Sequence, residues 1–419
     1  MALTHWGMRG TGDWVTDQRP QNWRETILYL EPNGSAPLTA ILSKLKKEPT
    51  DDPQFNWWSK MTPTQNATIT GVYTDAGLSS AYTSGGEAGD TLYIKMSESD
   101  VRSFRIGHQV LLRDASDLDV DVNVKVTAAV KNGASSYIKV TLLEDDDNSA
   151  SHDLSDADTA LIIGNINEEG SDAPTSVLYD PVKHYNYTQI FRTTLEHTGT
   201  AIKTRLRTGD QVKEAKREAL LLHAIEMEKA FIFGVPTEGT GSGGKPERTT
   251  GGIKHFIDST RKLDFLDEGK TWANGGLDWM DNVTELLFKY QGSTKIGLCG
   301  SGALVGINKI ARANGTFQLS PATRAYGIRV VEWVTAFGSL DLKVHPLFSQ
   351  EPTLSHTILI VDLSNIIYRY LKGRDTKYQP KLQDNGIDGE KSGFLTEAGL
   401  ELHFPLTHMW LDNVGVDGA

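Results

Sequence analysis

The sequence has little of three things that many protein classes need. It has one cysteine, Cys299, among 419 residues, so no disulfide can form within the chain. No apolar run approaches the roughly 18 residues of a membrane span, and the first residues lack the basic and apolar segments of a secretion signal. Basic residues are outnumbered, because 42 Lys and Arg against 54 Asp and Glu give a net charge of −12. A soluble, globular protein from a reducing compartment is therefore expected, with no membrane partner and without the basic surface of a nucleic-acid binder.

The first 62 or so residues show no helix or strand periodicity. Prolines interrupt every candidate pattern, and we expect an extended arm. The arm ends in an aromatic cluster, Phe55, Trp57 and Trp58, whose apolar surface a lone tail cannot shelter from water. These three side chains are expected to dock on the body of the chain or on a neighbour, and they are our candidates for inter-subunit contacts.

Residues 64 to 178 alternate apolar and polar side chains, which is typical of strands that are buried on one face. Asn132-Gly133 favours a hairpin with a type I′ turn, because both residues tolerate positive φ. A small antiparallel sandwich or barrel is predicted. The expected strands are Thr91–Met96, Gln109–Leu112, Val120–Val130, Ser136–Leu143 and Ala160–Gly164.

A long helix is predicted from Thr208 to Phe233. Thr208 and Gln211 have the spacing of a capping box, and Gly234 and Pro236 end the pattern. The second half of this segment is apolar almost all round, so we expect it to be buried.

An α/β region follows a Gly-rich stretch. Helices are expected at 279–290, 301–313 and 363–371, and strands at 295–299, 328–335, 340–344, 357–361 and within 394–411.

Two glycine-rich motifs resemble nucleotide-binding loops. Gly239 to Lys245 matches the first seven positions of a phosphate-binding loop, but Pro246 stands where Ser or Thr is needed and a helix precedes it. We interpret it as a turn, and keep a nucleotide-binding enzyme as an alternative. Gly297 to Gly302 lies between a strand and a helix, yet its glycine spacing differs from a dinucleotide fingerprint.

Metal-ligating and nucleophilic residues do not form a recognisable pattern. Asp117, Asp119 and Asp121 lack the Gly and Glu of a calcium loop. We interpret Asp119, Asp121 and Asn123 as the solvated face of a strand, with weak calcium binding as the alternative. His223 and Glu226 lie three apart on the long helix without a second pair. Cys299 is expected to be an inert core thiol. We assign no catalytic, cofactor-binding or metal-binding residue, and expect no enzyme activity.

The order of several segments resembles the major capsid proteins of tailed bacteriophages, in a subfamily related to the capsid protein of phage SU ten. The segments that carry the resemblance are Pro53 to Trp58, Tyr185 to Thr200, Glu218 to Gly234, Arg248 to Ile257 and Gly399 to Phe404.

The resemblance implies an α+β Johnson-type capsid fold with an N-terminal arm, an extended loop, a spine helix, and peripheral and axial domains. A small antiparallel β-domain is inserted in or beside the extended loop. The expected divisions are 1–63 for the arm, 64–178 for the inserted domain, 179–277 for the peripheral domain with its spine helix at 208–233, 278–375 for the axial domain, and 376–419 for the return strands.

The function implied is that of a shell protein, which self-assembles as hexamers and pentamers into an icosahedral phage head around double-stranded DNA. The DNA would be contacted only nonspecifically. Scaffold, portal and decoration proteins are implied partners, and the location is the virion after synthesis in the host bacterial cytoplasm. The alternative within this fold is an encapsulin-like nanocompartment shell.

Overall fold

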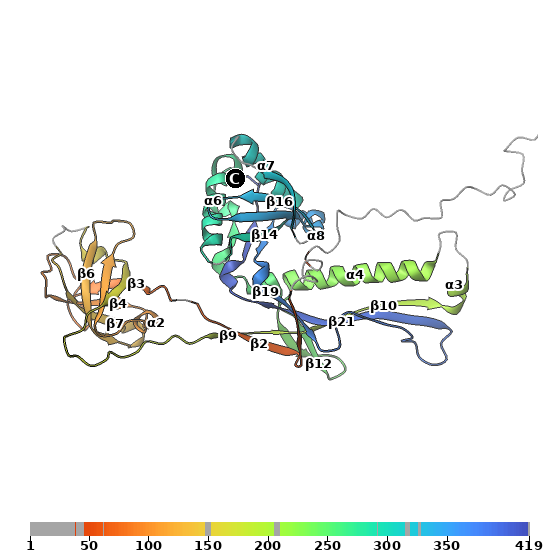
Figure 1. Cartoon of the computed structure of the whole chain (residues 1–419), viewed down its shortest axis with the longest axis horizontal. Coiled ribbons are helices and arrows are strands. Elements are labelled where there is room, and N and C mark those ends of the chain that lie inside the picture. The colour runs from red at the N-terminus through yellow and green to blue at the C-terminus, as the bar shows by residue number, and fades with distance from the viewer. Residues whose placement is uncertain are drawn as a thin grey trace, which may run out of the picture. The chain divides into compact units, whose positions relative to one another are not determined.

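The computed structural model describes residues 38, 46–61, 63–146, 152–204, 210–290, 292–314, 319–325 and 328–417 (Figure 1). Most of the predicted arm and Thr208 lie outside these residues. The chain divides into two compact units. One is Lys60–Val182, which we call the barrel unit, and the other is formed by the chain on both sides of it, which we call the frame.

The barrel unit is a closed six-stranded barrel in which every neighbouring pair is antiparallel. Its strand order is β3-β4-β7-β6-β5-β8. Alternate side chains point inward, so Val122, Val124 and Val126 are buried in one core. The strands are β3 Asn66–Tyr73, β4 Thr91–Met96, β5 His108–Arg113, β6 Asp121–Val130, β7 Tyr137–Leu142 and β8 Thr159–Asn165, with the short helix α2 Glu98–Val101 between β4 and β5.

The structure therefore takes the barrel form of the predicted β region, and adds β3, which the sequence had not indicated. The hairpin at Asn132-Gly133 exists, but its turn is not type I′. Asn132 has φ −149°, and Gly133–Ser135 forms a short 3₁₀ turn instead. The longer connection leaves positive φ to Gly133 alone.

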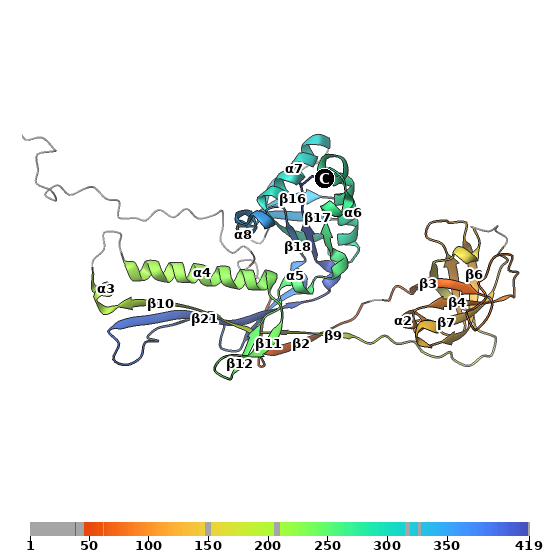
Figure 2. The ribbon, with the colours of Figure 1, turned by 180° about the vertical axis from the view of Figure 1, so that it is seen from behind.

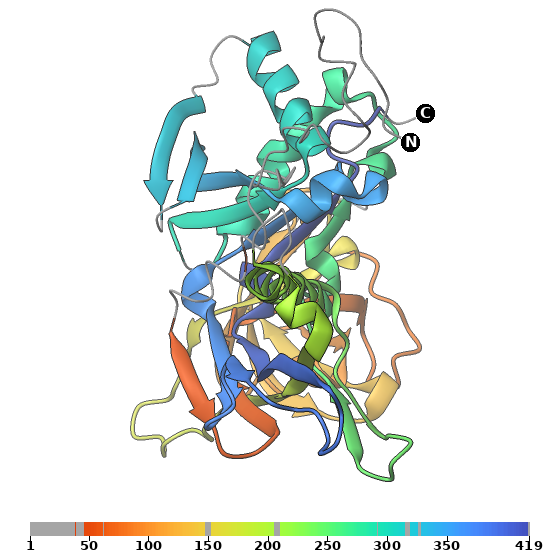
Figure 3. The ribbon, with the colours of Figure 1, turned by 90° about the vertical axis from the view of Figure 1, so that its right-hand side faces the viewer.

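In the frame, the long helix α4 (Gln211–Phe233) lies along a five-stranded sheet (Figures 1 and 3). Its buried side chains recur at helical spacing, at Ala219, His223, Met227 and Phe231, and face β10 and β21. The sheet has the order β1-β19-β21-β10 with β20 also on β21. Its strands are β1 Lys47–Thr50, β10 Gln189–Thr198, β19 Ile366–Leu371, β20 Lys377–Gln379 and β21 Gly389–Leu402.

The start of α4 corrects the predicted cap. Asp210, not Thr208, is the N-cap, and its Oδ1 accepts hydrogen bonds from the amides of Val212 (3.0 Å) and Lys213 (3.3 Å). An aspartate at this position satisfies two otherwise free amides and also complements the helix dipole.

A seven-stranded mixed sheet forms the other layer of the frame, in the order β13-β22-β18-β14-β17-β16-β15. Consecutive residues of β18 enter two different cores: Ile360 packs in a core with residues of α6 and α7, whereas Leu359 joins the core that contains Phe231 of α4. The elements are β13 Lys262–Asp264, α6 Trp272–Phe288, β14 Thr294–Cys299, α7 Ser301–Asn314, β15 Leu319–Ala325, β16 Ile328–Val334, β17 Ser339–Val344, α8 Pro346–Gln350, β18 Ile358–Val361 and β22 Met409–Asp412.

Three expectations for this region differ from the structure. The helix predicted at 363–371 is a 3₁₀ turn followed by β19, because Ile366–Leu371 pairs with both β1 and β21. The predicted boundary at 278 falls inside α6, and β22, which we had grouped with the return strands, belongs to the seven-stranded sheet.

Two short two-stranded sheets complete the frame (Figure 2). β2 (Gln54–Ser59) pairs with β9 (Val182–Tyr187), so the barrel unit is inserted between two strands that lie side by side. β11 (Thr237–Thr240) pairs with β12 (Pro246–Thr249), and the short helices α3 and α5 span Gly199–Lys203 and Ile253–Phe256. The described residues thus have the predicted α+β architecture, with a long helix along a sheet and an inserted antiparallel β-domain.

Candidate assembly surfaces

The aromatic cluster of β2 is divided between the inside and the outside of the frame. Phe55 and Trp57 are each 6% exposed, whereas Trp58 is 64% exposed. Trp57 lies among aromatic rings of the same chain, with centroid distances of 6.1 Å to Phe55, 5.8 Å to His184 and 5.9 Å to Phe256. Phe55 and Trp57 therefore dock on their own subunit, and Trp58 remains the candidate for a contact between subunits.

The ring of His184 closes the inner face of the β2–β9 ribbon. Its Nε2 lies 2.7 Å from Ser59 Oγ, and burial, together with nearby His403, lowers the pKa of His184. A neutral imidazole therefore stacks on Trp57 at neutral pH.

The outer face of the same ribbon is aromatic as well. Side chains alternate along a strand, and His184 and Asn186 face inward, so Tyr185 shares the outer face with Trp58. Tyr185 is 46% exposed and packs edge-on against Tyr187, with centroids 5.7 Å apart. Tyr185 was not among the predicted contact residues, although the alternation in Tyr-Asn-Tyr could have indicated it. We call Trp58, Tyr185 and Tyr187 the ribbon face.

Two apolar side chains of α4 are also exposed. Leu220 and Leu222 are 45% and 47% exposed, and at 3.6 residues per turn they lie about 200° apart, one on each side of the buried stripe. A solvated helix face normally carries polar residues, so exposed leucines here favour coverage by another chain or segment.

His223 of α4 has a structural role. Its Nδ1 lies 3.0 Å from Thr193 Oγ1 and its Nε2 lies 2.7 Å from Thr396 Oγ1, so both nitrogens are used between helix and sheet. Burial lowers the pKa of this histidine. It is not available to pair with Glu226 as a metal ligand.

A buried charged group connects α4 with two other segments. Glu228 Oε1 accepts a hydrogen bond from the amide of Leu38 (3.0 Å) and lies 2.5 Å from His345 Nε2, and both side chains are fully buried. Leu38 belongs to the predicted arm and His345 immediately precedes α8. The arm, the long helix and the seven-stranded layer thus meet at one carboxylate, which no local sequence pattern had indicated.

The motif Gly239 to Lys245 forms the tip of the β11–β12 hairpin. The amide of Gly241 donates to the carbonyl of Lys245 and that of Gly244 to the carbonyl of Gly241, each at 2.9 Å. These amides are used within the turn, and a strand follows where a phosphate-binding loop needs a helix. The nucleotide alternative therefore lacks its site.

The other motifs are explained by packing. A Cβ on Gly300 would lie 2.3 Å from the carbonyl oxygen of Ser355, so that glycine permits a close backbone approach. Cys299 is buried, and burial raises its pKa to about 12, which leaves the thiol protonated and inert.

The aspartates before β6 do not follow the predicted strand pattern. Asp117 and Asp119 lie in a turn that precedes β6, and their carboxylates come together with His152. Within the described residues these three side chains form the one set of three or more potential metal ligands with ligand atoms inside 4.8 Å of one another.

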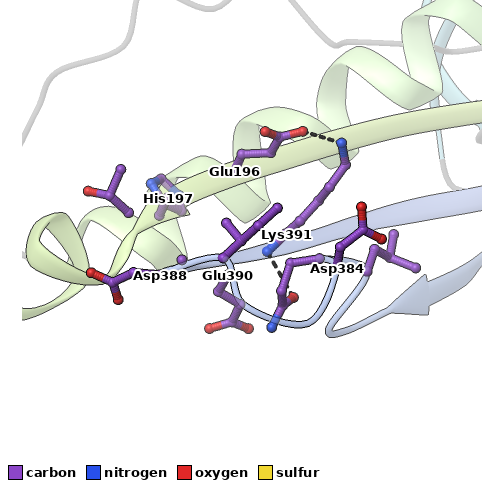
Figure 4. A pocket seen from close by; sticks show the side chains of 11 residues that line it. Glu196, His197, Asp384, Asp388, Glu390 and Lys391 are labelled. Carbon is purple, nitrogen blue, oxygen red and sulfur yellow. Dashed lines mark hydrogen bonds and ion pairs between the residues drawn. The ribbon is translucent and has the colours of Figure 1, made fainter.

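A cavity of about 400 Å³ lies between the end of β10 and the loop that leads into β21 (Figure 4). Its charged lining consists mainly of carboxylates, with Lys391 paired to Glu196. The remaining carboxylates are Asp384, Asp388 and Glu390. Such a lining suits a basic side chain of a partner better than a nucleic acid.

No helix within the described residues is long and apolar enough to cross a membrane.

Comparison with known proteins gives one family over nearly the whole chain. The family model described as SU10 major capsid protein matches residues 9–415. A curated relative, the major capsid protein of Pseudomonas phage PaMx41, is 26% identical over 405 residues, which cover 91% of this chain and 89% of the relative.

Solved structures with some similarity include a phage capsid, a second phage chain and a bacterial encapsulin. The capsid of Myoviridae phage XM1 is 8% identical with a TM-score of 0.46, covering 97% of this chain and 100% of that one. A Mycobacterium phage Cain chain is 8% identical with a TM-score of 0.44, covering 95% and 92%. The SrpI encapsulin of Synechococcus elongatus is 11% identical with a TM-score of 0.39, covering 57% and 77%.

Proposed function

The chain belongs to the SU10 major capsid protein family, and we propose that copies of this phage major capsid protein assemble as hexamers and pentamers into an icosahedral head around double-stranded DNA. The observation that carries this proposal is the family match over residues 9–415. A major capsid protein has a structural role, acts by associating with itself, and resides in the virion. Synthesis in the cytoplasm of a host bacterium is part of the proposal.

The ribbon face and the exposed leucines of α4 support self-assembly. Burying an aromatic side chain such as Trp58 against a neighbour would contribute about 2–4 kcal/mol, at about 25 cal/mol per Å². Contacts of this size are weak one at a time, but each subunit of a closed shell makes several at once, and the simultaneous contacts give a durable particle.

The elements of the frame can be assigned to the parts of a capsid subunit. We assign α4 and the five-stranded sheet to the peripheral domain, and the seven-stranded sheet with α6 and α7 to the axial domain. The β2–β9 ribbon is assigned to the extended loop, with the barrel unit inserted in it. The acidic net charge of −12 supports a lining along which packaged DNA is held only nonspecifically.

Other virion proteins enter the proposal as partners. A portal at one vertex, a scaffold during assembly and decoration proteins on the shell are the classes that a head of this kind uses. The exposed Leu220 and Leu222 of α4 and the carboxylate-lined cavity beside β21 offer apolar and acidic contact points to such partners.

Electron microscopy with light scattering of the purified full chain tests assembly directly. We expect closed shells, alone or with the phage's scaffold protein supplied. Nuclease-protected DNA inside particles from infected cells would support a phage head, whereas an enclosed protein cargo would support the encapsulin-like alternative. Subunits that stay monomeric in every condition, scaffold included, would contradict both.

A further inference from the structure

The connection between β7 and β8 of the barrel unit holds two buried aspartates. Asp146 is 2% exposed and Asp153 is fully buried. Asp146 Oδ2 accepts hydrogen bonds from the hydroxyl of Tyr82 (2.6 Å) and from the amide of Leu154 (3.1 Å). Asp153 Oδ1 accepts from the amide of Ser155 (2.9 Å) and from its hydroxyl. The second oxygen of each carboxylate, Oδ1 of Asp146 and Oδ2 of Asp153, has no hydrogen-bond partner among the described residues.

Neither carboxylate forms an ion pair with a described basic side chain. The segment between them, residues 147–152, contains no Lys or Arg, and its single histidine, His152, contacts the carboxylate of Asp117 instead. A buried ionised carboxylate without a positive partner is strongly unfavourable. The loop therefore needs a positive charge that the described side chains do not supply.

Both aspartates act on one hydroxyl group. Burial raises the pKa of Tyr82, and the hydrogen bond to Asp146 and the charges of Asp146 and Asp153 raise it further. The hydroxyl of Tyr82 also accepts a hydrogen bond from the amide of Gly86 at 2.8 Å, while the carbonyl of Gly86 accepts one from the amide of Asp146 at 2.8 Å. Asp146 is thus held by Tyr82 and by the amide of Leu154, the residue that follows Asp153, which brings the two aspartates to the same end of the connection.

We propose that Asp146 and Asp153 bind a divalent cation of the calcium type through their unpartnered oxygens, and that the ion fastens the β7–β8 connection to the barrel. Calcium prefers six to eight oxygen ligands and accepts carboxylates together with backbone carbonyls and water. Two anionic oxygens in a buried setting supply the charge that attracts such an ion, and the ion removes the cost of burying them.

The cluster of Asp117, Asp119 and His152 is the rival position for a cation on this unit. Asp117 is already satisfied, because its Oδ1 accepts from the amide of Asp119 (3.0 Å) and its Oδ2 contacts His152 Nδ1 (2.5 Å). The side chains of this cluster are also more exposed than Asp146 and Asp153, at 28% for Asp117 and 50% for His152. Solvent can stabilise this cluster without an ion, whereas it cannot stabilise Asp146 and Asp153.

Terbium luminescence tests the site, because Tb³⁺ replaces Ca²⁺ and is sensitised by a nearby tyrosine. The full chain, stripped with EGTA, is titrated with Tb³⁺ under tyrosine excitation and then competed with Ca²⁺. We expect the Tb³⁺ emission to saturate and to fall when Ca²⁺ displaces the bound Tb³⁺. The affinity for Tb³⁺ should be at least about tenfold weaker in Asp146→Asn and in Asp153→Asn. It should equal that of the wild type in the matched variant Asp117→Asn. Calcium should also raise the unfolding temperature of the barrel unit in the wild type but not in Asp146→Asn.

Three results would overturn the proposal. The first is that neither Tb³⁺ nor Ca²⁺ binds saturably up to millimolar concentrations. The second is that Asp117→Asn loses binding while Asp146→Asn retains it. The third is that calcium raises the unfolding temperature of Asp146→Asn as much as that of the wild type. Without metal, Asp146→Asn should unfold at the wild-type temperature or higher, since it removes an uncompensated buried charge. Should Asp146→Asn fail to fold, the wild type and Tyr82→Phe are compared instead. Isothermal titration should show that both bind calcium, whereas the Tb³⁺ emission sensitised by tyrosine should be weaker in Tyr82→Phe.

Discussion

The barrel unit and the frame solve the problem of burying apolar surface in different ways. In the barrel every strand has two neighbours, so no strand edge is left open, and its core draws only on residues 67 to 160. In the described part of the frame the five-stranded and the seven-stranded sheet each end in edge strands, and one of its two cores joins Leu38 with Trp410. The barrel unit is complete by itself, whereas the frame exposes edges and apolar faces that another subunit can cover.

Core truncations should separate the two units most strongly. Phe231 of α4 is fully buried between Phe191 and Tyr368, with centroids at 5.9 Å and 6.1 Å. Phe231→Ala should lower the free energy of unfolding of the frame by about 3–5 kcal/mol and leave the barrel unchanged, while Val124→Ala should cost the barrel about 2–3 kcal/mol. Calorimetry of unassembled subunits measures both transitions. A shift of both transitions by either variant would mean that the units unfold as one.

Acid should weaken the frame more than the barrel. Burial lowers the pKa of His184, His223, His255 and His408 in the frame, that of His408 to about 4, and that of His108 alone in the barrel. Each buried imidazole stays neutral while its unfolded form takes up a proton below pH about 6.5, so stability is full above that pH and falls below it. From His408 the loss should reach about 2 kcal/mol at pH 5.

The measurement is the unfolding temperature of each transition between pH 7 and pH 5. His408→Asn serves as the control, and its frame transition should fall less with acid than that of the wild type. If the unfolding temperatures of the two units fell equally with acid, the buried histidines of the frame would not be the cause of its acid sensitivity.

Removing the cap of α4 should have a smaller effect that is confined to the frame. Asp210→Ala leaves the amides of Val212 and Lys213 without their acceptor, at a cost of about 1 kcal/mol in the free energy of unfolding. Asp210→Asn keeps an acceptor oxygen and should lie within a few tenths of the wild type. Chemical denaturation of the unassembled subunit compares the three proteins, and a neutral Asp210→Ala would show that this helix end does not depend on its cap.

Trp58 should affect subunit stability least and assembly most. Because it is exposed, Trp58→Ala should change the free energy of unfolding by less than about 0.5 kcal/mol, while particle yield by light scattering falls sharply. Trp57→Ala is the matched control, since truncating this buried ring should cost about 3–5 kcal/mol of folding. Normal shells from Trp58→Ala would remove the ribbon face from the list of subunit contacts.

The same contrast explains which parts of the fold the sequence could predict. Strands of the barrel alternate strictly and pair mostly with near neighbours, so β4 was predicted with its observed bounds and the barrel was one of two forms expected. In the frame, β19 was mistaken for a helix, because its apolar residues fit either period and its partners, β1 and β21, lie far apart in the chain. Long-range pairing leaves no local signal.

Candidate assembly residues were predictable only as a group. The cluster of Phe55, Trp57 and Trp58 indicated a docking point, but which ring faces inward depends on the pairing of β2 with β9 and on Phe256. Glu228 and His345 are 117 residues apart, and neither belongs to a recognisable motif. The long helix, by contrast, was predicted from its length and composition, and its predicted start lies three residues before the observed one.

The side-by-side course of β2 and β9 has a practical consequence for this protein's relatives and for its use. A segment whose two ends meet at neighbouring strands can be exchanged for another domain without rerouting the rest of the polypeptide. Evolution could therefore vary the barrel unit while the frame stays the same. For the same reason, an antigen joined to the chain at Ser59 and Lys183 would be carried once by every subunit.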